Sequence, residues 1–139
     1  MNRRAACIIL IFGLLLGTVA MAAEQDKSAA VSGAREWLSL VDSGKYSESW
    51  DEAAGYFQGS IGKNKWVQML TSVRSPLGRN ISRKLAKSTL KKELPGAPDG
   101  NYVICQFNSQ FEKKKSAKET VTMMLGQDGT WRMAGYFIK

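Results

Sequence analysis

The spacing of apolar residues changes once along this chain, near Gly78, and that change limits the fold more than any other feature. Before Gly78, apolar residues recur every three or four positions, which is the period of helices with one buried face. After it they recur at every second position, which is the period of strands. Helices followed by consecutive strands predict an α+β domain, in which helices cover one face of an antiparallel sheet.

Three helices are expected in the first half of the chain. The first spans Ala29 to Val41, and Gly44 follows it as a left-handed C-cap. The second begins at about Ser47 and ends before Gly59. The third runs from about Lys63 to Val73. Each helix places large aromatic residues at helical spacing on one face, namely Trp37, Trp50, Phe57 and Trp66.

Four strands are expected in the second half, and short connections make them an antiparallel meander. Asp128-Gly129 predicts a tight final hairpin, because glycine readily adopts a positive φ angle. Lys113-Lys114-Lys115 is interpreted as the preceding turn. The expected strands are Ile81–Leu94, Tyr102–Phe111, Glu119–Leu125 and Thr130–Ile138.

The two faces of the predicted sheet differ in polarity. One face is wholly apolar and is expected to pack against the helices; it carries Val103, Cys105, Phe107, Val121, Met123 and Leu125. The other face mixes apolar and polar side chains, so it would leave a sizeable patch on a monomer. We therefore expect a homodimer contact there, formed by Tyr102, Ile104, Thr120, Thr122 and Met124.

The start of the chain has the order of a secretory signal peptide. Basic Arg3-Arg4 precedes a nearly unbroken apolar run, which ends in the small residues of Ala20-Met21-Ala22. We expect cleavage near Ala22, which leaves residues 23–139 as one domain in the periplasm or outside the cell. The alternative is an uncleaved membrane anchor, since residues 5–23 are just long enough to span a bilayer.

The charge of the exported domain indicates what it can bind, and its cysteine content indicates whether it can form a disulfide. The full chain carries a net charge of +8, to which Arg3 and Arg4 contribute two, so residues 23–139 carry +6. That charge favours anionic envelope surfaces, and export argues against nucleic acid. Cys105 is the only cysteine left after cleavage, so the mature chain forms no internal disulfide. A candidate anion site, or a set of solvated charges, comprises Arg74, Arg79, Arg83 and Lys84.

The residue types argue against most catalytic chemistries. The chain has no histidine, which excludes Ser-His and Cys-His pairs and histidine-bound metals. Cys105 lies among apolar residues and is interpreted as a core residue, and Asp51 as a surface carboxylate. No metal or cofactor is expected. The aromatic residues either fill the core or line a pocket for a small apolar ligand: Trp37, Trp50, Phe57, Trp66, Phe107 and Trp131.

Several stretches resemble the exported family DUF4019: Ser49–Asp51, Arg74–Gly78, Ser82–Leu85, Leu94–Val103, Glu119–Met124 and Trp131–Ile138. More distantly, the element order is similar to that of the NTF2-like superfamily, which includes ketosteroid isomerases. The resemblance implies a cone-shaped fold with a pocket between helices and sheet, and it brings no established activity. We therefore expect a non-enzymatic binding or interaction module. The alternatives are a small isomerase or cyclase that uses the pocket, and a basic protein that docks on the cell envelope.

Overall fold

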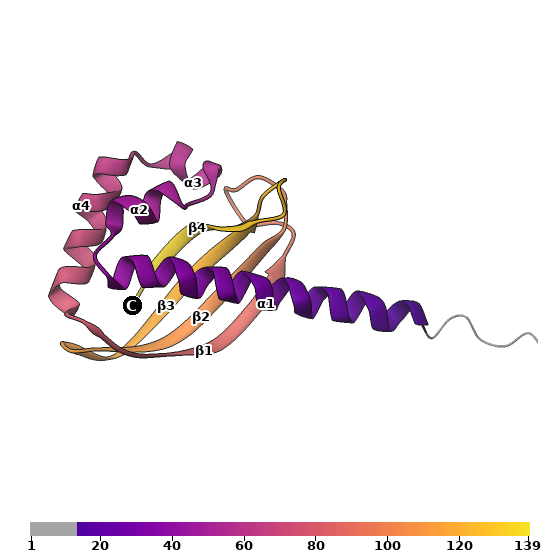
Figure 1. Ribbon diagram of the computed structural model, residues 1–139, viewed down its shortest axis with the longest axis horizontal. Helices are drawn as coiled ribbons and strands as arrows, with labels where there is room; N and C mark the ends of the chain where they lie inside the picture. Colours follow the sequence, from indigo (N-terminus) through magenta and orange to yellow (C-terminus); the bar gives the residue numbers. More distant parts are fainter. Residues whose placement is uncertain (1–13) are drawn as a thin grey trace, which may run out of the picture.

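A computed structural model describes residues 14–139 and places the helices on one side of a four-stranded sheet (Figure 1). The expected α+β class is confirmed, and the arrangement is compatible with the NTF2-like cone. The helices are α1 (Leu14–Asp42), α2 (Tyr46–Asp51), α3 (Gly55–Ser60) and α4 (Lys63–Arg74), followed by the short 3-10 helix η1 (Ser75–Leu77). The strands are β1 (Asn80–Lys91), β2 (Tyr102–Phe111), β3 (Lys114–Leu125) and β4 (Trp131–Ile138).

The sheet is the antiparallel meander that the sequence predicts, with strand order β1-β2-β3-β4. The predicted lysine turn is wrong in its extent. Lys114 pairs with Phe111, so the turn shrinks to Glu112 and Lys113, and β3 begins well before Glu119. The gain in ladder hydrogen bonds outweighs the poor strand propensity of the lysines.

The core lies between α1 and the predicted apolar face of the sheet. Trp37 and Trp66 are almost fully buried there, with ring centroids 6.3 Å apart, and Phe57 meets Trp66 edge to face at 4.9 Å. Leu125 is only partly buried, because it lies at the end of β3. The strand side chains that complete the core are Val103, Cys105, Phe107, Val121, Met123 and Met133.

Two helix boundaries differ from the prediction. Helix α1 begins at Leu14 rather than Ala29, and the long N-terminal part projects beyond the sheet (Figure 1). The periodicity missed this part because none of residues 17–29 is buried. The second predicted helix is divided into α2 and α3. Ala54 adopts an extended conformation, and its N–H donates to the Met133 carbonyl at 2.8 Å, so a contact with β4 replaces a helical hydrogen bond.

The two predicted glycine turns are confirmed. Gly44 ends α1 with φ +73°, and the next amide, of Lys45, donates to the Leu40 carbonyl at 2.9 Å. This satisfies carbonyl groups that have no partner inside the helix. Gly129 has φ +79° in the hairpin between β3 and β4. Both positions need a backbone conformation that costs other residues about 1 kcal/mol or more.

Much of the predicted leader, residues 1–13, lies outside the described residues. The described remainder of that segment is helical and exposes large apolar side chains, with Val19 68% and Met21 75% accessible. Among residues 14–139, no helix combines the length and the apolar character that a membrane crossing requires.

Candidate functional site

A cleft of about 350 Å³ lies where α1, α2 and β4 meet. Its apolar floor contains Trp37 from α1, Met123 from β3, and Trp131 and Met133 from β4. Helix α1 can approach the sheet here because Gly33 has no side chain. A Cβ at that position would lie 3.1 Å from the Met123 methyl group and 3.5 Å from the Trp131 carbonyl.

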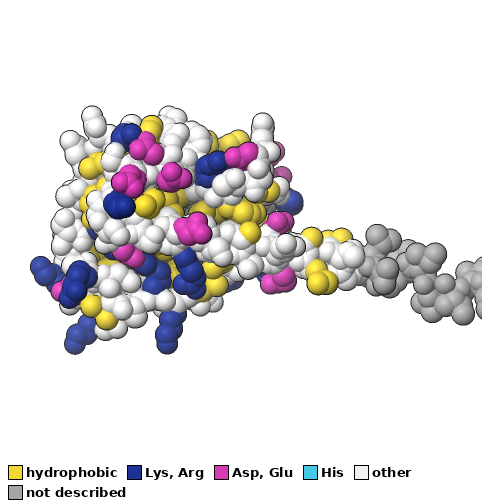
Figure 2. Space-filling view, in the orientation of Figure 1, with side chains coloured by type: hydrophobic (Ala, Val, Ile, Leu, Met, Phe, Trp, Pro, Cys, Tyr) yellow, Lys and Arg dark blue, Asp and Glu magenta, His cyan; other side chains and the backbone are white. Residues whose placement is uncertain are grey.

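Three exposed carboxylates surround this floor, although the chain as a whole is basic. Glu36 lies on α1, Glu48 lies on α2, and Glu52 directly follows α2 as its C-cap. Figure 2 shows acidic side chains beside apolar surface on this part of the molecule. The cation in the lining is Arg132, whose Nη2 forms an ion pair with Asp128 Oδ2 at 2.7 Å. The cleft is therefore a local acidic site with an aromatic floor.

The structure separates the aromatic residues that the sequence grouped as pocket lining. Trp37 and Trp131 line the cleft. Trp66 lines a second, apolar groove of about 220 Å³ between α4 and β4, together with the exposed Met69, Val73 and Phe137. The remaining three pack in or against the core and line neither concavity: Trp50, Phe57 and Phe107.

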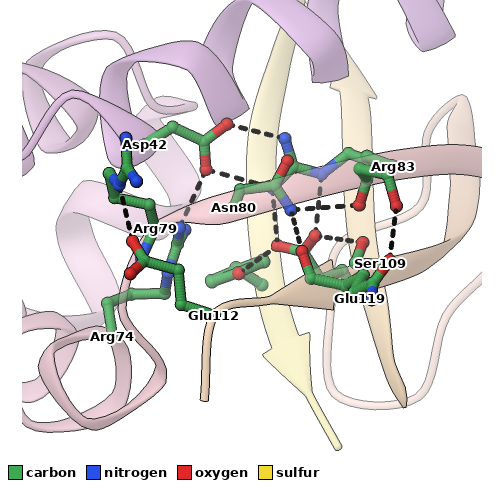
Figure 3. A network of polar contacts seen from close by, with 11 residues as sticks. Asp42, Arg74, Arg79, Asn80, Arg83, Ser109, Glu112 and Glu119 are labelled. Carbon is green, nitrogen blue, oxygen red and sulfur yellow. Dashed lines mark hydrogen bonds and ion pairs between the residues drawn. The ribbon is translucent and has the colours of Figure 1, made fainter. Parts of the chain in front are cut away.

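A buried polar network occupies the other end of the space between α1 and the sheet (Figure 3). At its centre is Glu119 of β3, which is completely buried. Arg83 of β1 donates to it through Nε at 2.7 Å, and the hydroxyl groups of Ser109 and Tyr136 donate to it as well. Arg83 also donates to Asp42, at the end of α1, at 2.7 Å. The network thus joins α1 to all four strands.

Arg74 extends this network from α4. It is only 4% exposed, donates to the Asp42 carboxylate through Nη2 at 2.8 Å, and lies 4.8 Å from the centre of the Phe111 ring. Burial acts to raise the pKa of Asp42, but the hydrogen bonds from Arg83 and Arg74 outweigh it, so that pKa lies below its usual value. Asp42 is therefore an ionised partner of two arginines at neutral pH.

The Tyr136–Glu119 contact has the composition of a catalytic pair but is used structurally. Burial, the negative charge of Glu119 and the hydrogen bond to it raise the pKa of the Tyr136 hydroxyl far above its usual value. The carboxylate oxygens of Glu119 already accept bonds from Arg83, Ser109 and Tyr136. Neither concavity described above is lined by Glu119. The pair therefore links β3 to β4, and Tyr136 also lines the groove between α4 and β4.

The predicted anion-site residues do not form one cluster. Arg74 and Arg83 lie in the buried network, where Asp42 and Glu119 neutralise them. Arg79 is 86% exposed and pairs with Glu112 at 2.6 Å. Lys84 lies on the opposite face of the sheet, because it is paired with the exposed Asn108.

The predicted homodimer residues lie on the face of the sheet away from the helices, but one of them is covered by a loop. Ile104, Thr120, Thr122 and Met124 are half-buried there. Tyr102 is completely buried, and its hydroxyl donates to the Pro98 carbonyl of the loop between β1 and β2. The aromatic side chain expected at that contact is therefore covered by the chain's own loop.

The two single-residue interpretations are confirmed. Asp51 is a surface carboxylate that pairs with Lys63 at 2.6 Å. Cys105 is completely buried, and burial raises the pKa of its thiol to about 11, so it is not a reactive thiolate at neutral pH. Among residues 14–139, no group of His, Cys, Asp or Glu side chains has an arrangement that could hold a metal ion.

Sequence reasoning missed the carboxylates of the buried network and of the cleft between α1, α2 and β4. Glu119 alternates with Val121 on the buried face, so extending the strand pattern backwards to Ala117 would have placed a carboxylate in the core. Such a group requires a cationic partner. Glu36, Glu48 and Glu52 give no comparable signal, because on their helices they resemble ordinary solvent-facing residues.

Comparison with known proteins agrees with this architecture. A solved structure of a protein from Catenulispora acidiphila is 12% identical in sequence, with a TM-score of 0.54 over 86% of this chain and 93% of that one. At that identity the likeness supports the fold alone. No curated protein matches the chain. The family model described as a protein of unknown function (DUF4019) matches residues 33–136, and the chain therefore belongs to that family.

Proposed function

We propose that this chain is an exported, non-enzymatic binding module whose cleft between α1, α2 and β4 holds a cationic, partly apolar ligand. The observation that carries the proposal is the combination of an aromatic floor, Trp37 and Trp131, with the carboxylates of Glu36, Glu48 and Glu52 around it. An acidic concavity on a basic protein is a place where a cation is favoured over an anion.

The ligand class follows from the lining. An ammonium or guanidinium group gains from nearby carboxylates and from an indole ring, while the apolar part of the ligand packs against the partly exposed side chain of Trp131. Among the described residues, Glu36 and Glu52 have no ion-pair partner of their own, and Glu48 has only Lys45 at 3.8 Å. The cleft pairs no hydroxyl or thiol with a base, which supports binding rather than catalysis.

Three small probes of one shape test the charge preference: phenethylammonium, 2-phenylethanol and phenylacetate. We expect phenethylammonium to bind with a Kd of roughly 1 mM, as suits a fragment of this size, and the other two to bind much more weakly. Tryptophan fluorescence and the indole N–H signals in NMR spectra report on the cleft, because Trp131 and Trp37 line it. Equal binding of all three probes would contradict the proposal.

A pair of double variants separates the cleft from the overall charge. Glu36→Gln with Glu52→Gln is expected to weaken phenethylammonium binding by about five- to tenfold. Asp26→Asn with Glu93→Gln removes the same charge outside the cleft, and its affinity should stay within about twofold of wild type. If both double variants weaken binding equally, the cleft is not the binding site.

Export is the second part of the proposal. The position of α1 supports export, since removing everything before Ala23 takes away no buried side chain among residues 17–22. The exported form is expected to begin at Ala23 or Glu24. Mass spectrometry of the protein from its native host measures this directly, and an intact Met1 or a membrane-embedded product would refute the cleavage.

A further inference from the structure

The face of the sheet away from the helices is basic and carries no carboxylate. Cross-strand pairing places Lys84, Asn108 and Lys118 side by side on β1, β2 and β3. The next row pairs Lys87 with Gln106. The other outward positions of β1, β2 and β3 are Ser82, Thr89, Lys91, Tyr102, Ile104, Gln110, Ser116, Thr120, Thr122 and Met124, and none of them is Asp or Glu.

The lysines of this face are exposed and unneutralised. Among residues 14–139, no carboxylate lies within ion-pair distance of Lys84, Lys87, Lys91 or Lys118. In Figure 2, Lys and Arg side chains project from the lower edge, over β1 and the β2–β3 hairpin. Lys84 and Lys118 are two strands apart, so their Cα atoms lie roughly 10 Å from each other. Such a spacing suits an extended anionic chain that crosses the strands.

One end of this face is hollowed. A depression of about 280 Å³ lies towards the β2–β3 hairpin, near the lower end of the usual size of ligand sites. Its lining combines two lysines with hydroxyl and amide side chains, and the apolar side chain in it is Ala117. The polar residues of the lining are Ser82, Lys84, Asn108, Ser109, Gln110, Lys115 and Ser116, of which Ser109 donates its hydroxyl inward to Glu119.

We propose that this depression and the lysines beside it bind an anionic polysaccharide, with one acidic sugar unit in the depression. The lysines supply donors and positive charge for a carboxylate or sulfate group. Hydroxyl and amide side chains both donate and accept hydrogen bonds, which is what the hydroxyl groups of a sugar require. A bare phosphate would use donors alone, so the acceptors of Asn108 and Gln110 favour a sugar.

Other occupants fit the same surface less well. Single-stranded nucleic acid binds through bases stacked on aromatic side chains, and the depression has no aromatic residue in its lining. A bilayer surface would need apolar side chains to enter the headgroup region, and Ala117 is too small for that. A second copy of this chain would bring lysines of the same face together without a carboxylate to meet them.

The test uses the protein as purified from its host, with oligogalacturonate as the probe. Neutral dextran, a thymidine oligonucleotide and anionic phosphatidylglycerol vesicles serve as comparisons. We expect oligogalacturonate to bind, with an affinity that falls as salt rises, and dextran not to bind. Lys84→Gln with Lys115→Gln is expected to reduce the affinity about tenfold, and Asn108→Ala at unchanged charge about threefold.

The matched control is Lys45→Gln with Lys65→Gln, which removes the same charge from the opposite layer and should leave the affinity within about twofold. Equal losses in the two double variants would overturn the proposal, because net charge alone would then explain binding. Equal or tighter binding of the oligonucleotide or the vesicles, or no binding of oligogalacturonate, would also overturn it. Sedimentation in the same buffers must show a monomer; self-association through this face would assign it to a second copy instead.

Discussion

Glu119→Ala is expected to lower the free energy of unfolding by about 3–5 kcal/mol, which is the usual cost of removing one partner from a buried ion pair. The carboxylate is completely buried and accepts hydrogen bonds from Arg83, Ser109 and Tyr136. Its loss leaves two hydroxyl groups without their acceptor and reduces the neutralisation of Arg83, whose side chain is only 11% exposed. Urea denaturation followed by tryptophan fluorescence measures the change.

The matched control for this variant is Glu112→Ala. Glu112 also pairs with an arginine at short distance, 2.6 Å to Arg79, but that arginine is 86% exposed. Water replaces the lost contact there, so the denaturation midpoint should barely move. If Glu119→Ala does not fold at all, Glu119→Gln keeps one carbonyl acceptor and should give an intermediate loss. Equal effects of Glu119→Ala and Glu112→Ala would show that burial does not decide the strength of this network.

Phe107→Ala is expected to cost about 3–5 kcal/mol of unfolding free energy. The ring is completely buried in the centre of β2, where it belongs to the cluster that joins α1 to the sheet. Truncation removes apolar area from the core and leaves a cavity that strands paired on both sides cannot close. Because the total free energy of unfolding of a small domain is only about 5–15 kcal/mol, this variant should unfold at a clearly lower temperature than the wild type.

Phe137→Ala provides the comparison, since it makes the same substitution in a strand of the same sheet at a ring that is 57% exposed. Its loss should be under about 1 kcal/mol. Thermal unfolding by circular dichroism ranks the two variants. A large loss at Phe137 would mean that the groove between α4 and β4 contributes more to stability than its exposure indicates. Phe107→Leu, which leaves a smaller cavity, keeps the comparison usable if Phe107→Ala does not fold.

The sequence alone determined the class of fold, the order of the strands and most of the core. These properties are local or periodic: the change of period near Gly78, the alternation through Val103, Cys105 and Phe107, and the glycine at position 129 are visible without any tertiary contact. Side-chain period decides which face of an element is buried. It predicted correctly that Cys105 is a core residue and that the strands form a meander.

The tertiary structure decided the features that depend on residues far apart in the chain. The second predicted helix breaks at Ala54 because its amide bonds to Met133, which no local propensity reveals. Arg83 and Glu119 are 36 residues apart, so only the folded sheet makes them partners and removes Arg83 from a predicted anion site. The acidic cleft likewise arises where α1, α2 and β4 converge. Electrostatic partners are chosen by distance in space, and a linear pattern does not contain that distance.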